Sequence, residues 1–528
     1  MVWHLKSVYQ DCFKELSDAT RGISSLKKEL ILFVMMALCF ISIVNSSWKA
    51  SPDSALYLEL GESIAHGTGY KFNGERHTYV PPGYPFLVSV TVKLFGNSFL
   101  AFRAMMSTVG IVTGFCGYLL IFRLLGRDLA LVIGGLFAIN NTLLLNSTYT
   151  TSDTLFTLFS LLSLMGVSAI RPGSPRFPGL TLAGVMSGVP ALVRINGWGL
   201  PVSSGLFLFS SMIKIALPKR VLFAVLFVFL ALIVPCLWEI HKIGYPVSMT
   251  EGEYVKAVTG RTLGTQLSII SKAAWDYIPE TASALAGVSI KTGFVEIIIA
   301  LLAVIGFWVS WKRGERLFTY LTAVQFGGLL FSPAGARYIL LLIPGLLLFM
   351  FQGLTITITQ LNKRTSIKWR KIFRLRGTLV VVALCLFATN MGQNVVTISQ
   401  ARCALESGGA ESYRDKPFFV AARWLRANAN GEPVLTMNPR IIRYLTGLPT
   451  VETLRSGCPE ETALPSTRNQ IAAMIEKRKP AFLFLDDKDP ALKSLIVEAA
   501  ESLNFKVDVV PEASFGNRYS VSRLSRGN

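Results

Sequence analysis

The stretch SPDSALYLELGESIAHGTGY, residues 51–70, follows directly on the first strongly apolar segment of the chain, residues 30–48. It carries Asp53, Glu59 and Glu62 within a run of ten residues. Leucine and isoleucine recur at helical spacing with polar residues between them, which predicts a helix that lies along a membrane surface rather than crossing it. The chain therefore leaves a span and forms an acidic interfacial helix at once, which is the organisation of a polytopic membrane protein.

The composition supports this class of protein. Of the 528 residues, 51% are hydrophobic and only 16% are charged, whereas about 25% are charged in an average soluble domain. The net charge of +20 would fit nucleic-acid binding, but the basic residues gather in short loops between apolar segments, where topology signals are found. We therefore expect a lipid bilayer, and no nucleic acid, as the partner of this charge.

Apolar segments indicate a polytopic α-helical protein of about eleven spans. They are residues 30–48, 98–122, 129–147, 153–170, 179–194, 197–213, 221–238, 292–310, 317–332, 338–356 and 378–394. Every second loop is basic, and the stretch NKRTSIKWRKIFRLRG (362–377) holds seven basic residues and no acid. This alternation predicts a cytoplasmic N-terminus and an extracytoplasmic C-terminus.

The same pattern divides the chain into a transmembrane domain, residues 1–394, and an extracytoplasmic domain, residues 395–528. The long outer regions of the first domain are residues 49–97 and 239–291. In the second domain, KPFFVAARWLRANA, STRNQIAAMIEKRK and DPALKSLIVEAAESL predict helices, and EPVLTM, PAFLFLDD and FKVDVVPE predict strands. We expect a small α/β domain with a partly parallel sheet. Cys403 and Cys458 both lie there, and the sequence fits a disulfide and two separate thiols equally well.

Two carboxylates and two arginines are predicted at the outer ends of spans. Asp53 is either a helix N-cap or a functional group at the membrane surface. Asp153, at the mouth of the fourth span, has the same two readings, with Ser152 as the alternative cap. Arg194 and Arg337 lie on the outer side, against the positive-inside tendency. Because arginine holds phosphate through two hydrogen bonds, this set fits chemistry on a phosphate-linked lipid, with a carboxylate as general base.

The stretch YVPPGYPFLVSVTVKLFG (79–96) is too short for a comfortable span and predicts a second interfacial or re-entrant helix. Pro82 and its neighbouring prolines stiffen its start. Tyr79 and Tyr84 suit a membrane interface. An anchoring turn without chemistry is the alternative.

The ordered set of motifs resembles the membrane-embedded GT-C glycosyltransferases over residues 30–350. The motifs are PDSALYLELGESIAHGTGY, PPGYPFLVSVTVKLFG, YLLIFRLLG, SDTLFTLFSLLSL, SGVPALVRINGWGLP and ARYILLLIP. The nearest group is the protein mannosyltransferase and aminoarabinose transferase superfamily, with its bacterial RgtA-like members. The resemblance implies transfer of a hexose or pentose from a polyprenyl-phosphate donor to an extracytoplasmic glycan, lipid or protein. The sequence fits a bacterial plasma membrane and an endoplasmic reticulum, and the absence of N-x-S/T from the C-terminal domain favours the bacterial membrane.

The resemblance carries roles onto individual residues. It implies that Asp53 is the general base and Asp153 the second acid, with Arg194, Arg337 and Tyr338 near the donor phosphate. It further implies a substrate loop that includes Tyr57, Glu62, Tyr79, Pro82 and Tyr84. Many members have two adjacent acids where this chain has Asp53-Ser54, which weakens an assignment to true protein mannosyltransferases. Metal dependence varies across the superfamily, so the resemblance is compatible with a divalent metal, but the sequence itself indicates no ligands for one.

Two other functions are compatible with a protein of this kind. A transporter or flippase of lipid-linked sugars would use charged residues buried in the middle of spans, whereas the charges here gather at the outer ends. A non-enzymatic envelope assembly protein would act through partner binding by its C-terminal domain.

Overall fold

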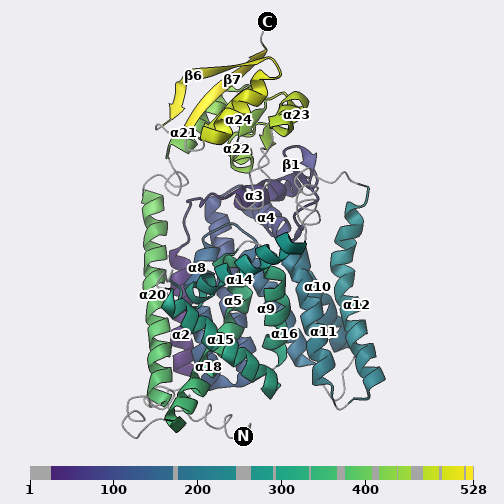
Figure 1. The fold of residues 1–528 in the computed structure, drawn as a ribbon, viewed down its shortest axis with the longest axis vertical. Coiled ribbons are helices and arrows are strands. Elements are labelled where there is room, and N and C mark those ends of the chain that lie inside the picture. Colours follow the sequence, from purple (N-terminus) through teal and green to yellow (C-terminus); the bar gives the residue numbers. More distant parts are fainter. Residues whose placement is uncertain are drawn as a thin grey trace.

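The structure is a computed structural model of the 528-residue chain. It describes residues 25–170, 177–213, 215–244, 263–288, 293–314, 316–331, 334–364, 375–406, 416–436, 438–452, 468–486, 490–515 and 519–526. A helical bundle forms the larger part, and a small α/β domain covers one end of it (Figure 1).

The bundle consists of helices of very different length. They are α2 Ser25–Ser42, α5 Phe99–Leu125, α6 Arg127–Leu129, the π-helix η1 Ala130–Gly134, α7 Gly135–Ala138, α8 Asn141–Ser147, α9 Asp153–Ala169, α10 Phe177–Gly188, the short η2 Val189–Leu192 and η3 Ile195–Trp198, α11 Gly199–Ser211, α12 Leu217–Lys242, α14 Leu263–Ala286, α15 Phe294–Arg313, α16 Arg316–Leu329, α17 Ala336–Ile339, η4 Leu340–Leu342, α18 Ile343–Arg364 and α20 Leu375–Glu406.

The protein is a polytopic helical membrane protein, as predicted, but fewer helices meet the length and composition of a span than the eleven expected. Within the described residues five do so: Phe99–Leu125, Leu217–Lys242, Phe294–Arg313, Ala336–Leu361 and Gly377–Glu406. A sixth is counted if the bent pair Arg127–Ala138 and Asn141–Ser147 forms one span. Two of the other predicted spans are short apolar helices, Asp153–Ala169 and Phe177–Leu192. The count of eleven therefore remains a prediction.

One region predicted as an outer loop contains a packed helix. Helix α14 lies inside the range 239–291 and contacts α15, α17 and α20. Its Tyr277 is fully buried and packs against Phe326 of α16. The hydropathy pattern missed α14 because Lys272, Asp276 and Glu280 interrupt the run of apolar residues in its sequence. The rest of that loop falls largely outside the described residues.

The first outer region, between α2 and α5, forms two helices that lie across the end of the bundle (Figure 1). These are α3 Pro52–Ala65 and α4 Gly83–Phe95, joined through the two-residue antiparallel strands β1 Lys71–Phe72 and β2 Glu75–Arg76. Both helices were predicted. They pack closely because Gly61 of α3 leaves room for Val88 of α4, where a Cβ atom would collide with the valine side chain.

Helix α3 differs from its prediction in what surrounds it. Its residues Ala55, Leu56, Leu58 and Leu60 are all at most 2% exposed, so both sides of the helix are covered by protein. One side contacts α4, and another contacts α22 Pro439–Thr446 of the C-terminal domain. The helix is therefore a layer between two parts of the molecule.

The C-terminal domain has the predicted partly parallel sheet. Its elements are α21 Lys416–Asn428, β3 Val434–Thr436, α22, β4 Thr450–Glu452, α23 Arg468–Arg478, β5 Phe482–Asp486, α24 Pro490–Glu501, β6 Phe505–Phe515 and β7 Tyr519–Arg526. The strand order is β4-β3-β5-β7-β6, with β4, β3 and β5 parallel and β7 antiparallel to both of its neighbours. All three predicted helices and all three predicted strands are present, and α22, β4 and β7 are additional.

One prediction about this domain is corrected by the structure, and another is not tested by it. The predicted boundary at residues 394 and 395 lies inside α20, which continues to Glu406. The question of a Cys403–Cys458 disulfide involves Cys458, which lies outside the described residues.

Candidate active site

Helix α3 begins in a way that leaves the Asp53 carboxylate available. Ser51 is the N-cap: its Oγ accepts the Ser54 N–H at 3.1 Å, and the Ser54 Oγ accepts the Ser51 N–H at 2.9 Å. Trp48 adds a hydrogen bond from its indole N–H to the Ser54 Oγ at 3.2 Å. This reciprocal cap satisfies the first orphan N–H groups of the helix. The alternative in which Asp53 is the cap is therefore wrong.

The Asp53 side chain is held between two arginines from distant parts of the chain. Arg337 Nη1 lies 3.2 Å from its Oδ2, and Arg440 Nη1 lies 3.6 Å from its Oδ1. Arg337 is in α17 of the bundle, and Arg440 is in α22 of the C-terminal domain. Asp53 is 38% exposed, so an incoming group has access to this carboxylate.

The second carboxylate forms a buried ion pair. Asp153, the first residue of α9, lies 2.7 Å from Arg194 Nη1, and their side chains are 2% and 16% exposed. Arg194 also donates to the Ser152 Oγ at 3.2 Å. Neither Ser152 nor Asp153 makes a side-chain cap of α9, so the capping alternative is wrong here as well. Asp153 Oδ2 is buried and has no hydrogen-bond partner within the described parts of the chain.

Tyr57 connects α3 to this buried pair. Its hydroxyl lies 2.8 Å from the Ser152 Oγ. Burial raises the pKa of Tyr57 to about 12, so the phenol stays protonated at neutral pH and serves as a hydrogen-bonding group. Its ring packs edge-on against Tyr84 at a centroid distance of 4.9 Å.

Tyr338 lies between the two arginines and joins the two ion pairs. Its hydroxyl accepts a hydrogen bond from Arg337 Nη2 at 2.7 Å. The guanidinium carbons of Arg337 and Arg194 lie 4.8 and 5.3 Å from the centroid of its ring, within cation–π range. The cluster thus contains the carboxylates of Asp53 and Asp153 together with three guanidinium groups. The ion pairs among the described residues thus bring three positive charges to two negative ones, an arrangement that favours an anionic ligand.

The structure gives the other predicted residues different surroundings. Tyr84 is fully buried under α3, although the sequence predicted a place at the membrane interface. Glu62 lies apart from Asp53, where its Oε1 accepts hydrogen bonds from Tyr444 at 2.9 Å and Asn97 at 2.6 Å. Pro82 precedes α4 as its N-cap residue, and Tyr79 is half-buried in the preceding turn.

Sequence reasoning missed the contribution of α22. Besides Arg440 it supplies Arg443, whose Nε lies 3.0 Å from Glu59 Oε1, and Tyr444, which bonds to Glu62. The signal that was available is the stretch PRIIRYLT, in which two arginines and a tyrosine lie on helical spacing. That stretch does not indicate that it contacts α3, because the contact joins residues almost 400 positions apart.

The imidazole near this cluster is not an acid–base group at neutral pH. Burial, reinforced by the charge of Arg440, lowers the pKa of His77 to about 3. Its Nε2 instead accepts the Val80 N–H at 3.1 Å. The Asp53 carboxylate, by contrast, is 38% exposed and can be reached by an incoming molecule. Among the described residues no three His, Cys, Asp or Glu side chains lie together as metal ligands do.

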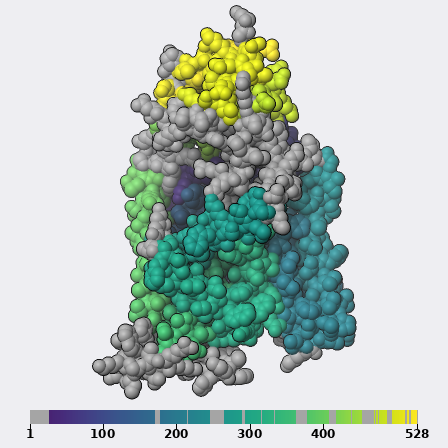
Figure 2. Space-filling model, viewed as in Figure 1, coloured from purple at the N-terminus to yellow at the C-terminus, as the bar shows by residue number. Residues whose placement is uncertain are grey.

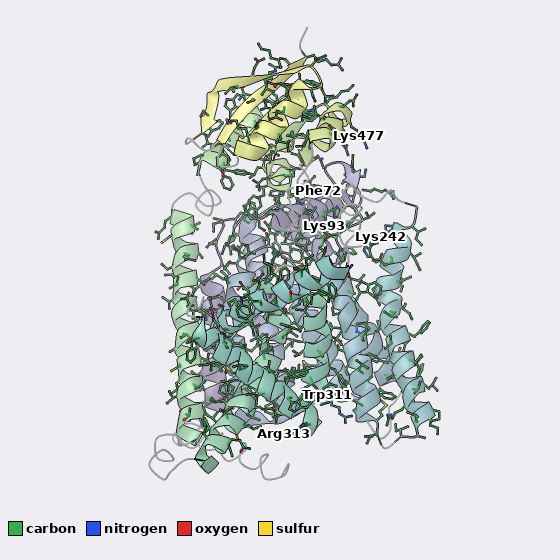
Figure 3. The ribbon with its side chains drawn as sticks, in the orientation of Figure 1. Phe72, Lys93, Lys242, Trp311, Arg313 and Lys477 are labelled. Carbon is green, nitrogen blue, oxygen red and sulfur yellow. The ribbon has the colours of Figure 1, made fainter. Side chains whose placement is uncertain are left out.

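The site lies where the bundle meets the C-terminal domain. Figure 3 shows Phe72 and Lys93 at that end of the bundle and Lys477 in the domain above them. Figure 2 shows purple atoms of the first part of the chain between the level of the teal helices and that of the yellow domain.

Comparison with known proteins identifies the fold. The sequence pattern of the family described as dolichyl-phosphate-mannose-protein mannosyltransferase matches residues 79–238. No curated protein matches the chain by sequence. The structure is similar to that of ArnT from Cupriavidus metallidurans in the apo state, with a TM-score of 0.57 and 15% identity over 94% of this chain and 98% of ArnT.

Two further structures contain lipid phosphates. ArnT bound to undecaprenyl phosphate matches with a TM-score of 0.56 and 14% identity over 93% of this chain and 97% of that one. The oligosaccharyltransferase AglB from Archaeoglobus fulgidus, in complex with an inhibitory peptide and a dolichol-phosphate, matches with a TM-score of 0.54 and 11% identity over 94% of this chain and 74% of that one. The resemblance to the GT-C superfamily predicted from the sequence is thereby confirmed, and the chain has an ArnT-like fold.

Proposed function

We propose that this protein is an integral membrane glycosyltransferase that transfers a sugar from a polyprenyl-phosphate donor to an acceptor on the extracytoplasmic side. One observation carries the proposal. Asp53 and Asp153, a hundred residues apart in the chain, belong to one cluster through Arg337, Tyr338 and Arg194. Donor and acceptor groups can meet at such a cluster because it offers an accessible carboxylate beside an excess of guanidinium groups.

The donor phosphate is assigned to the arginine side of the cluster. Arg337 binds Asp53 at 3.2 Å while both side chains are more than one-third exposed, and such exposed pairs contribute only about 0–1 kcal/mol. Exchanging this partner for a phosphate, which accepts two parallel N–H bonds from a guanidinium, therefore costs little. The undecaprenyl phosphate of the ArnT structure and the dolichol-phosphate of the AglB structure are ligands of this chemical class.

The transfer step follows from these roles. An acceptor hydroxyl oxygen attacks the anomeric carbon of the donor sugar and forms the new glycosidic bond. The bond from that carbon to the phosphate oxygen breaks, and its electron pair stays on the phosphate, which leaves as polyprenyl phosphate. Asp53 takes the hydroxyl proton as general base, and Arg337 stabilises the additional negative charge on the leaving phosphate.

Asp153 has a positioning role in this proposal. Its pairing with Arg194 fixes that guanidinium beside Tyr338, and Tyr338 in turn bonds Arg337. The acceptor reaches Asp53 from the side of Arg440 and the C-terminal domain, where the carboxylate is exposed.

The Asp53→Asn variant tests the proposal without a known sugar. In cells that lack the protein, the polyprenyl-phosphate sugar that serves as donor should accumulate and be detected by mass spectrometry of extracted lipids. The wild-type gene should clear this lipid, and Asp53→Asn should not, at equal protein level and equal melting temperature.

Asp508→Asn is the matched control, because Asp508 is an exposed aspartate of β6 paired only with Lys506 and Ser525 among the described contacts. This control should clear the lipid like the wild type. Clearance by Asp53→Asn at the wild-type rate would remove Asp53 as the base.

A further inference from the structure

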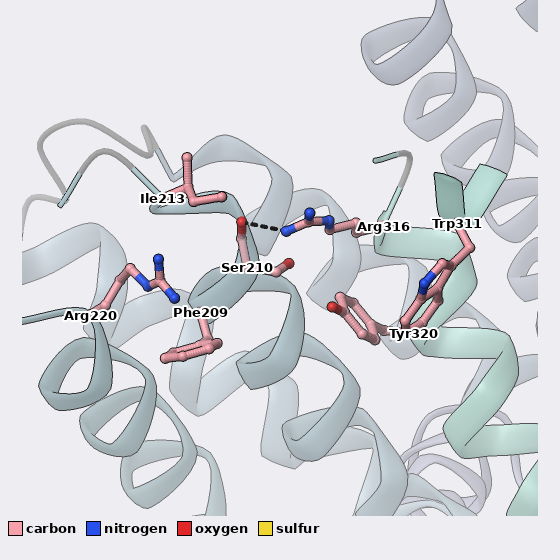
Figure 4. Close-up of a pocket in the computed structure, with 7 residues that line it drawn as sticks. All are labelled: Phe209, Ser210, Ile213, Arg220, Trp311, Arg316 and Tyr320. Carbon is pink, nitrogen blue, oxygen red and sulfur yellow. Dashed lines mark hydrogen bonds between the residues drawn. The ribbon is translucent and has the colours of Figure 1, made fainter. Parts of the chain in front are cut away.

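A second group of arginine and aromatic side chains lies at the other end of the bundle. A pocket of about 220 Å³ is formed there by α11, α12, α15 and α16 (Figure 4). It is lined by Phe209, Ser210, Ile213, Arg220, Trp311, Arg316 and Tyr320. Figure 3 shows Trp311 and Arg313 at the end of the bundle away from Phe72 and Lys93. The basic loops assign this end to the cytoplasm.

Both arginines of the pocket retain unused hydrogen-bond donors. The guanidinium carbon of Arg220 lies 4.3 Å from the centroid of the Phe209 ring, and its Nε is buried without a hydrogen-bond partner in the described structure. Arg316 Nη1 donates to the Ser210 carbonyl oxygen at 2.8 Å. A guanidinium has five N–H donors, and neither arginine has a carboxylate within 4.0 Å among the described residues. Within the described residues, two positive charges without a carboxylate partner therefore line one small cavity.

Exposed apolar side chains adjoin the pocket. Ile213 at its rim is 67% exposed and Trp311 is 44% exposed. Tryptophan is enriched where acyl chains meet headgroups. Exposed apolar side chains continue from the rim along both flanking helices, namely Leu217, Val221, Leu222 and Val225 of α12 and Ile305, Trp308, Val304 and Leu301 of α15. A molecule with an anionic headgroup and apolar tails is complementary to a basic pocket that adjoins apolar helix surfaces.

We propose that the pocket binds the phosphate group of an anionic phospholipid from the cytoplasmic leaflet. Arg220 and Arg316 hold the phosphate oxygens, and the acyl chains lie along the exposed faces of α12 and α15. The volume is smaller than the roughly 300–1,000 Å³ of pockets for drug-sized ligands, which fits a headgroup. Lys312 and Arg313, which follow Trp311 of the pocket in the chain, add to the attraction for anionic lipid. This site is independent of sugar transfer at the opposite end.

Native mass spectrometry of the full-length protein tests the proposal. Purified protein is freed of lipid in detergent and equilibrated with equal amounts of phosphatidylglycerol and phosphatidylcholine. The wild type should retain at least about tenfold more phosphatidylglycerol. Arg220→Gln and Arg316→Gln should each remove most of this preference, while Lys219→Gln, an equal loss of charge on an exposed side chain next to Arg220, should keep it.

Two results would overturn the proposal. One is equal retention of the two lipids by the wild type, a measurement that needs no variant to fold. The other is a wild-type preference that persists in both arginine variants with unchanged melting temperatures. A parallel sample with a thousandfold excess of inorganic phosphate separates the sources of the anion: retained phosphatidylglycerol supports the lipid, and its complete displacement assigns the pocket to a free phosphate instead.

Discussion

At the scale of single residues, exposure separates the two carboxylates of the candidate site. Asp53 is 38% exposed and lies between two arginines, whereas Asp153 is 2% exposed and paired with one. An exposed ion pair contributes about 0–1 kcal/mol and opens readily. A buried pair is costly to break, because an uncompensated charge is left in a poorly solvated place. This difference suits Asp53 for contact with a substrate and Asp153 for holding the site in shape.

The buried pair predicts a non-additive response to mutation. Asp153→Asn and Arg194→Gln should each lower the free energy of unfolding by about 3–5 kcal/mol, because each leaves one buried charge unpaired. The double variant should be clearly more stable than the sum of the two losses implies. Thermal unfolding of the purified protein in detergent measures all four members of this cycle. Strictly additive losses would mean that the two side chains do not act as a pair.

At the scale of helices and strands, the sequence predicted where the elements lie in the chain better than it predicted which elements contact each other. Apolar periodicity indicated α3 and α4 and the six predicted elements of the C-terminal domain, because these patterns are local. It missed α14, because charged residues interrupt the apolar run in its sequence. It also missed the role of α22, since the pairing of Arg440 with Asp53 and of Arg443 with Glu59 depends on how two parts of the chain meet. Four of the site residues, Asp53, Asp153, Arg194 and Arg337, were nevertheless indicated by their places at helix ends.

The docking of α22 on α3 predicts the effect of reversing one ion pair. Glu59 and Arg443 are 16% and 21% exposed and lie 3.0 Å apart. Glu59→Arg or Arg443→Glu alone places like charges together between the two parts of the molecule. Each should lower both the melting temperature and the clearance of the donor lipid, and the combination of both changes should recover part of each loss.

The pair Arg478–Glu75 is the control for this experiment. It also joins the C-terminal domain to the first outer region, at 2.6 Å, but its side chains are 44% and 62% exposed. Reversing Arg478 to Glu should change the melting temperature by no more than an ordinary surface substitution does. Equal losses at the two pairs would show that α22 has no special part in the docking.

At the scale of the whole molecule, the two ends of the bundle differ in chemistry. One end carries carboxylates, arginines and a soluble domain that covers them (Figure 1). The other carries basic loops and the pocket formed around Arg220 and Arg316. The sequence predicted this polarity from charge alone, although five or six helices within the described residues, and not eleven, meet the criteria of a span. The prediction of sidedness depends on which loops lie on the same side of the membrane. An error of two in the number of spans leaves every loop on its predicted side, so the sidedness does not depend on the exact number of spans.

This sidedness predicts the accessibility of residues at the two ends in intact cells. Lys242 is the last residue of α12, and Lys312 lies near the end of α15. Figure 3 shows Lys242 toward the C-terminal domain, whereas Trp311 and Arg313, the sequence neighbours of Lys312, lie at the opposite end of the bundle. In a background with Cys385→Ser, Cys403→Ser and Cys458→Ser, which removes both exposed cysteines of α20 and the cysteine of the C-terminal domain, Lys242→Cys should react with a membrane-impermeant maleimide on intact cells. Lys312→Cys should react only after the membrane is permeabilised, because basic loops are retained in the cytoplasm. Labelling of Lys312→Cys in intact cells would place the carboxylate cluster in the cytoplasm, where an extracytoplasmic acceptor does not reach it.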